Sequence, residues 1–353
     1  MTTLVTGAGG FVGGRVVEIL EAEAPGSVRA AIRRWSTAAR IGRLPVEIVQ
    51  CDIMDPAQVR DALVGVDRII HCAVGPGRVN VEGTRTLLEG ALEAGVERVV
   101  HVSTMDVYGD ATGDLPEDRP LLRVGADYGD SKIGAEEVCR SFVERGLAVS
   151  IIRPTIIYGP FSALWTEEFA ERLQVRPWPF PRELCSGTCN LVYVDDVVAG
   201  IRLALDRPDA VGEAFNINGP DRPTWFEYFV ALNDAMGLPE LQAQSSTAST
   251  LVAWGMKPVR ATAKFALNRF GDQIMALYKS SELAKKVMKG AEGLIRKSPT
   301  TGEFDLYGKV LSAPTDKAER LLGYRPAVDM GEGIERSVQW LRHSGFLDGG
   351  RPA

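Results

Sequence analysis

Residues 6–13 read Thr6-Gly7-Ala8-Gly9-Gly10-Phe11-Val12-Gly13 and lie between a short apolar run and an amphipathic helical pattern. Such a stretch predicts a strand, a tight turn and a helix that continues to about residue 23. Gly7 would permit the turn, Gly10 would remove a side chain where the backbone approaches a pyrophosphate, and Gly13 would let the helix pack closely on the strand. The helix N-terminus would face the phosphates, so we predict a dinucleotide site here.

Outward from this turn, short apolar runs alternate with helical patterns. Further strands are predicted at 28–32, 46–49, 68–73, 98–102 and 149–152, and helices are predicted from Asp55-Pro56 onward, at 79–94 and at 128–145. Strands separated by helices of this length predict an α/β fold with a Rossmann-type, doubly wound parallel sheet.

The pattern changes after Pro160. Strands are predicted there only at 191–194 and 214–217, helices at 195–205 and 224–236, and a rigid loop at 177–181. We therefore predict a dinucleotide-binding Rossmann domain at 1–160 and a smaller, mostly helical substrate-binding part at 161–353. The second part would include a basic helical insertion at about 240–312.

The overall composition is that of a globular protein, with 353 residues of which 45% are hydrophobic and 24% are charged. A net charge of −6 argues against nucleic-acid binding. No apolar run reaches the roughly 18 residues of a membrane-spanning helix, and the N-terminus shows no secretory signal pattern. Five scattered cysteines, an odd number, are typical of reduced thiols, so we expect a cytoplasmic protein.

Residues 251–297 differ in charge from the rest of the chain. They contain ten Lys and Arg against three acidic residues, and apolar residues are interleaved with the basic ones. This pattern predicts amphipathic helices with a solvated basic face, in a lid or a substrate-domain insertion. The alternatives are a peripheral contact with a membrane surface and a site for an anionic substrate.

The end of the second predicted strand bears on the choice of cofactor. An NAD site normally shows Asp or Glu about 20 residues after the glycines, where it binds the ribose hydroxyl. This sequence has Arg33 and Arg34 at that place. Because a guanidinium suits a 2′-phosphate, NADP(H) is favoured as the cofactor. NAD(H), with both arginines merely solvated, is the alternative.

The candidate reactive groups lie in Tyr128-Gly129-Asp130-Ser131-Lys132. Four residues apart on a helix, Tyr128 and Lys132 share one face. A phenol with a pKa near 10 is a poor base at neutral pH, and a nearby ammonium would lower that pKa toward the working range. Ser103 and Thr104 end a predicted strand at the edge where open α/β sheets bind ligands, and a hydroxyl there would hold a substrate oxygen.

These motifs together resemble those of the extended short-chain dehydrogenase/reductases, the NAD-dependent epimerase/dehydratase group, over nearly the whole chain. The stretches that carry the resemblance are residues 6–13, Cys51-Asp52-Ile53, Ile70-His71-Cys72-Ala73, Asn80-Val81-Glu82-Gly83-Thr84, His101-Val102-Ser103-Thr104, Val107-Tyr108-Gly109, 128–132, 153–160 and 192–197.

The resemblance implies roles for individual residues. Thr104, Tyr128 and Lys132 would occupy the family's catalytic positions, and Lys132 would also hold the nicotinamide ribose. Arg33 resembles the arginine of the NADPH-using ketone reductases in this group. The other implied cofactor contacts are Gly7, Gly10, Phe11, Val12 and Gly13 at the turn, Asp52 and Ile53 beside the adenine, and Ala73 and Val74 along the cofactor. Family members often dimerise through helices like those predicted at 79–94 and 128–145, so a homodimer is expected.

Three places depart from the sugar-nucleotide members of the family. Thr155 stands where they usually carry a diphosphate-binding Asn, and Cys189-Asn190-Leu191 stands where they carry an Arg. The 4,6-dehydratases follow the catalytic Thr with Asp-Glu, whereas this chain has Met105-Asp106, so the acid that expels water is missing. Dehydration is therefore not expected, and a nucleotide-sugar substrate is in doubt.

We accordingly predict an oxidoreductase that transfers hydride between NADP(H) and a ketone or secondary alcohol. The runner-up is a nucleotide-sugar 4-epimerase with tightly bound NAD. A third interpretation is a non-catalytic protein that binds NADP as a sensor.

Other candidate sites are weaker. No metal site is predicted, because the three histidines are dispersed and Cys185 and Cys189 lack a second ligand pair. His71 and His101 lie in apolar runs and are predicted to be buried in the core. A redox pair of the two cysteines is an alternative to two free thiols. Asp195 and Asp196 precede a helical pattern, and we expect them to act as N-capping residues.

Overall fold

The computed structural model describes residues 1–174, 181–241, 247, 251, 253–263, 269, 281 and 300–347. Most of the predicted basic insertion and of the predicted rigid loop at 177–181 lies outside these residues. The chain forms two compact units. The first comprises Met1–Thr166, Asn190–Arg222 and Leu311–Trp340, and the second comprises Glu167–Cys189, Pro223–Val310 and Leu341–Ala353.

A seven-stranded parallel sheet forms the centre of the first unit. Its order is β10 (Ala214–Ile217), β7 (Val149–Pro154), β5 (Arg98–Val102), β4 (Arg68–His71), β1 (Thr3–Thr6), β2 (Val28–Ile32) and β3 (Glu47–Gln50). The strand order runs outward in both directions from β1 and β4, as in a doubly wound fold, so the predicted fold class is confirmed. The carboxyl ends of β1 and β4 meet at the switch point where such sheets bind ligands.

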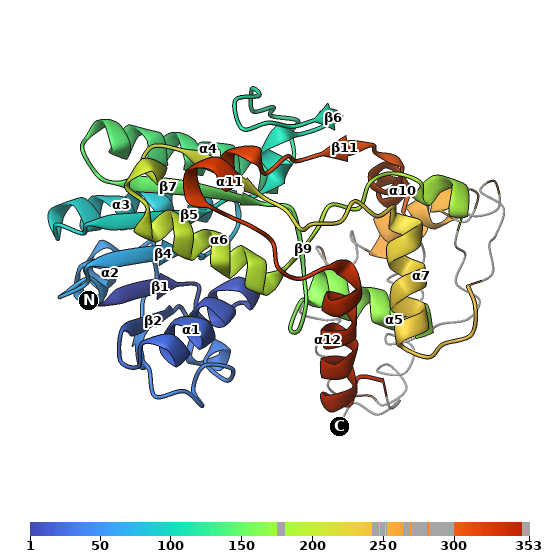
Figure 1. The fold of residues 1–353 in the computed structure, drawn as a ribbon, viewed down its shortest axis with the longest axis horizontal. Helices are drawn as coiled ribbons and strands as arrows, with labels where there is room; N and C mark the ends of the chain where they lie inside the picture. Colours follow the sequence, from blue (N-terminus) through green and yellow to red (C-terminus); the bar gives the residue numbers. More distant parts are fainter. Residues whose placement is uncertain are drawn as a thin grey trace. The chain divides into compact units, whose positions relative to one another are not determined.

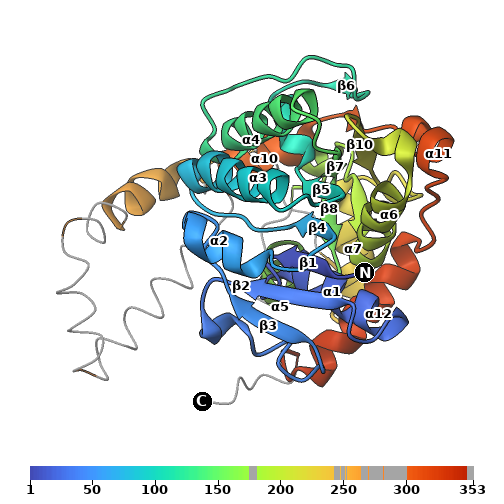
Figure 2. The ribbon, with the colours of Figure 1, turned by 90° about the vertical axis from the view of Figure 1, so that its left-hand side faces the viewer.

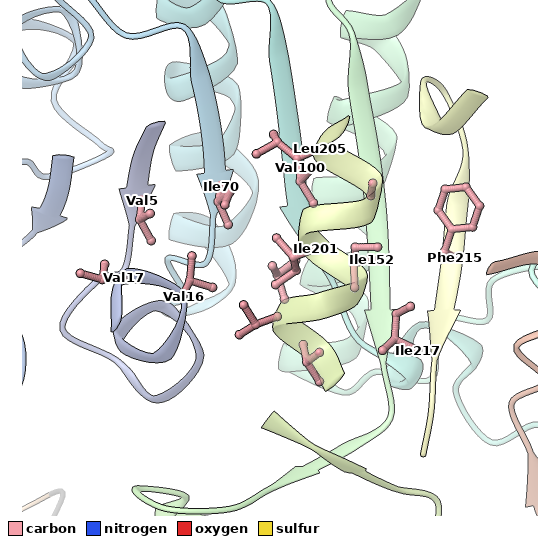
Figure 3. Packing of buried hydrophobic residues seen from close by; sticks show 14 of the residues in the cluster. Val5, Val16, Val17, Ile70, Val100, Ile152, Ile201, Leu205, Phe215 and Ile217 are labelled. Carbon is pink, nitrogen blue, oxygen red and sulfur yellow. The ribbon is translucent and has the colours of Figure 1, made fainter. Parts of the chain in front are cut away.

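Helices cover both faces of this sheet (Figure 1, Figure 2). One face carries α1 (Phe11–Glu23), α6 (Val194–Asp206) and α11 (Asp316–Leu322), and the other carries α2 (Pro56–Ala62), α3 (Thr84–Glu93) and α4 (Asp127–Glu144). Alternate strand residues serve the two faces because successive side chains of a strand point in opposite directions. Figure 3 shows Val5, Ile70, Val100 and Ile152 turned toward the helices of the first face.

The remaining elements of the first unit are two short strand pairs, four helical turns and most of one longer helix. They are the pair β6 (Gly113–Asp114) and β11 (Leu311–Ser312), the pair β8 (Ile156–Tyr158) and β9 (Leu191–Tyr193), the helical turns at Trp35–Thr37, Val79–Gly83, Met105–Tyr108 and Pro208–Ala210, and most of α12 (Met330–His343). The helix predicted at 79–94 thus begins with a π-turn, at Val79–Gly83, before α3.

The second unit is built around aromatic side chains. Its helices include α5 (Glu168–Gln174), α7 (Trp225–Ala235) and α10 (Thr301–Gly308), with a helical stretch at 253–263 and a 3₁₀ turn at Arg182–Cys185; the π-turn at Ala163–Glu167 leads into it. Rings from α5, α7 and α10 pack together, among them Phe169, Trp225 and Tyr307. None of the helices that the structure describes is long and apolar enough to span a membrane.

The two units do not follow a single cut in the sequence. β10 returns to the sheet by pairing with β7, and the segment that contains β9 belongs with it in the first unit. Each packing unit is made of three separate stretches of the chain, so these units do not correspond to a division into two functional domains. The functional boundary at residue 160 therefore stays a prediction.

The predicted capping role of Asp195 and Asp196 is wrong. Tyr193 precedes the first residue of α6, and no side chain caps this helix. The Asp195 carboxylate instead forms a bidentate ion pair with Arg15 of α1, with an Nε–Oδ1 distance of 2.6 Å. Asp196 accepts the backbone N–H groups of Ala327 and Val328 at 2.8 and 3.2 Å. Both carboxylates therefore join α6 to other parts of the first unit.

A buried ion pair joins β7 to α4. The guanidinium of Arg153 donates to both carboxylate oxygens of Glu136, at 2.9 and 2.7 Å, and both side chains are fully buried. Ser103, which directly follows β5, donates to the same carboxylate at 2.7 Å. Arg153 also donates to the Tyr108 hydroxyl at 2.9 Å and to the Glu117 carbonyl at 3.1 Å. The charges are thus compensated by a nearly complete set of hydrogen bonds.

We predict that Glu136→Gln lowers the free energy of unfolding by about 3–5 kcal/mol, because it leaves a buried guanidinium without its counter-charge. Glu137→Gln is the matched control, since Glu137 pairs with Arg123 at the surface, where such a pair contributes about 0–1 kcal/mol. Urea unfolding followed by circular dichroism measures both. Equal effects of the two substitutions would contradict the prediction.

Candidate cofactor and catalytic site

A cavity of about 480 Å³ lies in the first unit at the carboxyl edge of the sheet. It is lined by residues from the ends of β1, β2 and β4 and from the start of α1 and α4. All residues predicted to contact a cofactor line it: Gly7, Gly10, Phe11, Val12, Gly13, Arg33, Asp52, Ile53, Ala73, Val74, Tyr128 and Lys132. The structure therefore brings together side chains that are far apart in the sequence.

The glycine turn is shaped by close backbone contacts. Gly7 has a φ of +68°, and a Cβ added to it would lie 2.7 Å from the Ala73 nitrogen. A Cβ on Gly13 would collide with the Gly7 carbonyl oxygen, so Gly13 is required for α1 to pack on the turn. A Cβ on Gly10 would meet only this same oxygen, at 3.2 Å. Gly7 and Gly13 therefore serve the turn itself, whereas Gly10 keeps the adjacent space open.

The start of α1 fits a phosphate group. No side chain caps this helix at Gly10, and Phe11, Val12 and Gly13 line the cavity. The first N–H groups of a helix have no partner within the helix, and the helix dipole favours an anion there. An open turn beside an uncapped helix N-terminus is what a dinucleotide pyrophosphate requires.

Two arginines extend this positive region beyond β2. Arg33 and Arg34 line the cavity and are exposed. In the part of the chain that the structure describes, neither guanidinium makes a hydrogen bond or an ion pair. Ser36 and Thr37 follow them along the cavity wall. The Thr37 hydroxyl donates to the Arg34 carbonyl at 2.7 Å, so this end of the cavity offers the two guanidinium groups and the Ser36 hydroxyl as donors to a ligand.

The third part of the wall comes from the loop after β3. The Asp52 carboxylate accepts the N–H of Met54 at 3.0 Å, and the Asp52 N–H donates to Gln58 at 3.0 Å, so the loop is held in one conformation. Ile53 is buried and packs against Gly83, where an added Cβ would lie 2.6 Å from its side chain. Asp52 and Ile53 therefore both line the cavity; the place beside the adenine that the resemblance implies for them stays a prediction.

Tyr128 and Lys132 come from the first two turns of α4, and Thr104 comes from the end of β5. Lys132 is buried and donates from Nζ to the Val102 carbonyl at 2.8 Å, and burial lowers its pKa to about 8. The Thr104 hydroxyl accepts the N–H of Asp106 at 3.2 Å and hydrogen-bonds the Tyr128 phenol. Tyr128 and Lys132 thus line the cavity, whereas Thr104 lies beside Tyr128 and is not among the lining residues.

The prediction that Lys132 lowers the pKa of Tyr128 is wrong for this structure. Desolvation raises the pKa of Tyr128 to about 12, although 43% of the residue is exposed, and the charge of Asp106 acts in the same direction. The hydrogen bond with Thr104 opposes this shift only in part. The ammonium of Lys132 is bonded to the Val102 carbonyl. Tyr128 is therefore protonated at neutral pH, the form of a general acid.

The residues that depart from the sugar-nucleotide pattern are committed to internal contacts. Thr155 is buried, and its hydroxyl donates to the Asn218 side chain at 3.0 Å. Asn190 is also buried; it donates to the Leu311 carbonyl at 3.1 Å and accepts from Asn218 at 3.1 Å. These side chains serve the packing of the first unit.

Sequence reasoning missed part of the wall and its support. The cavity is also lined by Cys51 and Cys72, and burial raises the pKa of these thiols to about 11 and 12. Asn80 and Ser131 hold the start of α4 in place, with Asn80 donating to the Ser131 hydroxyl at 2.9 Å. Both lie within motifs quoted above. The motifs thus marked Asn80 and Ser131, but the hydrogen bond between them, 51 residues apart, was not visible in the sequence.

Comparison with known proteins matches the chain to a family and to relatives along part or nearly all of its length. A model of the NAD dependent epimerase/dehydratase family matches residues 3–218. Sterol demethylase protein B of Methylococcus capsulatus is 36% identical over 235 residues, which make up 62% of this chain and 70% of that protein. The 4-hydroxy-2-methyl-3-oxo-4-farnesyl-3,4-dihydroquinoline-1-oxide ketoreductase of Stigmatella aurantiaca is 25% identical over 95% of each chain.

Solved structures share the fold along the whole chain. A double mutant of the dTDP-glucose 4,6-dehydratase DesIV from Streptomyces venezuelae, solved with NAD bound, superposes with a TM-score of 0.71. The two chains are 27% identical, and the match covers 98% of each.

We predict that Gly10→Ala and Gly13→Ala have different effects. Gly13→Ala forces α1 away from the turn and lowers the free energy of unfolding by about 1–3 kcal/mol. Gly10→Ala places its Cβ 3.2 Å from the Gly7 carbonyl oxygen, so it should cost less stability than Gly13→Ala, while dinucleotide affinity falls by about tenfold or more. Differential scanning fluorimetry and titration with NADPH and NADH measure the two quantities. The opposite assignment of the two phenotypes would refute the roles given to the glycines.

Proposed function

Since the chain belongs to the NAD dependent epimerase/dehydratase family, we propose that it is an NADP(H)-dependent reductase of ketones, able to run in reverse on secondary alcohols. One observation carries the proposal. The Tyr128 phenol is hydrogen-bonded to Thr104 and protonated at neutral pH. It lines the same cavity as the open glycine turn and the two arginines, whose guanidinium groups make no hydrogen bond or ion pair with described residues.

Thr104 and Tyr128 would hold the substrate carbonyl oxygen between their hydroxyl groups. A nicotinamide bound in the cavity would supply hydride to the carbonyl carbon. As the C=O π bond opens, the oxygen takes the Tyr128 proton, so the product is a secondary alcohol and the phenol becomes a phenolate. The raised pKa of Tyr128 means that the phenolate then recovers a proton readily from solvent. Lys132, which lines the same cavity, would hold the ribose.

Ketone reduction is supported over dehydration and over a nucleotide-sugar substrate. Expulsion of water needs an acid beside the catalytic Thr, and Met105 there has no proton to give. Thr155 and Asn190 are buried in internal hydrogen bonds, so they offer no donors to a diphosphate. Among the relatives, the Stigmatella aurantiaca protein is a ketoreductase.

The setting proposed for this reaction is the cytosol. All five cysteines lie within the described residues, and all are free thiols. A reducing compartment keeps cysteines in this state. The cofactor would be exchanged in every turnover, as reduction consumes one NADPH for each ketone.

The first prediction from this proposed function concerns the choice between NADPH and NADH. Arg33→Asp should weaken NADPH binding by about tenfold or more and leave NADH binding within about twofold, because only NADPH carries the 2′-phosphate. Arg60→Asp makes the same change in net charge on α2, outside the cavity, and should alter neither affinity. Fluorescence titration gives the dissociation constants. Equal losses for both cofactors, or NAD⁺ released from the purified protein on denaturation, would overturn the NADPH assignment and favour the 4-epimerase.

The second prediction concerns the acid. Tyr128→Phe removes the proton donor and keeps the ring, so the rate of NADPH-dependent ketone reduction should fall by about 10²-fold or more while the NADPH dissociation constant stays within about twofold. A panel of aliphatic and aromatic ketones, followed by loss of NADPH absorbance, provides the assay. Activity retained in this variant would exclude Tyr128 as the acid.

A further inference from the structure

His71 lies at the end of β4, beneath the cavity, and uses both of its ring nitrogens. Nδ1 is 2.7 Å from the Thr6 hydroxyl and Nε2 is 3.0 Å from the Thr84 hydroxyl. The residue is 1% exposed. Its neighbour His101 on β5, whose ring centroid is 5.1 Å away, is equally buried but makes no hydrogen bond from either nitrogen to any described residue. The partners of His71 are therefore a property of its position and not of buried histidines in this sheet.

The hydrogen bonds around His71 have one consistent direction. Thr84 donates its only hydroxyl proton to the Asn80 carbonyl at 2.6 Å, so it must accept from Nε2–H of His71. A neutral imidazole has its acceptor on the other nitrogen, so Nδ1 accepts from the Thr6 hydroxyl. Burial, with the Lys132 charge, lowers the pKa of His71 to about 3, and the ring stays neutral.

Each end of this chain reaches a different part of the site. At one end, the Thr6 hydroxyl accepts the Ala73 N–H at 3.4 Å, and Thr6 directly precedes the glycine turn. Both residues line the cavity. His71 therefore holds the backbone on two sides of the region where a dinucleotide would bind.

At the other end, the chain continues to the catalytic helix. Asn80, which Thr84 bonds through its carbonyl, donates from its side chain to Ser131 at 2.9 Å. Ser131 donates in turn to the carbonyl of Tyr128 at 2.8 Å. Asn80 also accepts the Gly75 N–H at 2.9 Å, so the loop after β4 joins the same network.

We propose that His71 is a positioning residue whose two nitrogens act separately: Nδ1, through Thr6, fixes the dinucleotide-binding turn, and Nε2, through Thr84, Asn80 and Ser131, fixes Tyr128. The proposal rests on the function proposed above for Tyr128 and the turn. It assigns no proton transfer to His71. A bulky neutral residue that only filled space would produce no such division of effects.

Two amide variants separate the two nitrogens. Asn in place of His71 can present its oxygen near the Nδ1 position and accept from Thr6, but it does not reach Thr84. Gln can present its NH₂ near the Nε2 position and donate to Thr84, but it loses the acceptor for Thr6. We expect H71N to keep the NADPH dissociation constant within about twofold and to lower kcat by about tenfold or more, since small displacements of a catalytic group cost this much. H71Q should raise the dissociation constant about tenfold and change kcat by no more than about twofold.

A readout that needs no turnover accompanies these measurements. Tyrosine labelled with ¹³C at Cζ gives one NMR resonance for each ring, and the Y128F variant assigns that of Tyr128. In H71N this resonance should move, because the support of the Tyr128 carbonyl is lost, whereas in H71Q it should stay in place. If no ketone is reduced, the proposed function fails, while the resonance and the NADPH titration still decide the role of His71.

Two further variants complete the test. Thr84→Val breaks only the branch toward Tyr128 and should reproduce H71N, which keeps the proposal testable if H71N does not fold. His101→Leu removes a buried imidazole that makes no hydrogen bond to a described residue, so cofactor affinity, kcat and the Tyr128 resonance should all stay unchanged. If H71N and H71Q altered affinity and the resonance in equal proportion, or altered neither, the separate roles of the two nitrogens would be disproved.

Discussion

The ion pair between Arg153 and Glu136 is the interaction on which the geometry of the site depends. Tyr128, Lys132 and Glu136 are spaced four residues apart along α4, so all three lie on one face of the helix. Arg153 of β7 binds the Glu136 carboxylate on this face. Ser103, the residue before Thr104, donates to the same carboxylate. Thr104, the third of the proposed catalytic residues, is therefore held through its neighbour Ser103 by the same buried carboxylate. Such a pair adds little net stability compared with apolar packing, but only one arrangement of helix and strands satisfies it.

Two sets of buried polar groups lie beneath the cavity, and the members of each set are joined by hydrogen bonds. One set contains the ion pair and faces β7, and the other contains His71 and faces β4 and β1. Lys132 lies between them and reaches the Val102 carbonyl of β5. Because unsatisfied polar groups are costly in a protein interior, each set restrains the backbone segments that it joins.

Local features of the sequence were sufficient for the sheet and the glycine turn. The strand predicted at 28–32 and the strand predicted at 214–217 are found with those bounds, since a short apolar run and its flanking turns are properties of neighbouring residues. The role of Asp195 and the direction of the pKa shift of Tyr128 were misjudged for the opposite reason. Asp195 pairs with Arg15, 180 residues away, and the pKa of Tyr128 depends on desolvation and on Asp106 from another segment. The ion pair of Glu136 could not be foreseen either, because a glutamate in an amphipathic helix is usually solvated. The catalytic and cofactor roles themselves remain predictions.

The lack of internal partners for Arg33 and Arg34 has an evolutionary consequence. Elsewhere around the cavity, a residue that would contact the ligand also supports the fold: Gly13 packs on Gly7, and Lys132 bonds a strand carbonyl. The guanidinium groups of the two arginines make no hydrogen bond or ion pair with the described residues, so substitutions of these side chains should cost little folding stability. Under the NADP(H) assignment proposed above, descendants of this protein could therefore switch between phosphorylated and unphosphorylated dinucleotides in single mutational steps, whereas α4 is constrained to change only together with its neighbours.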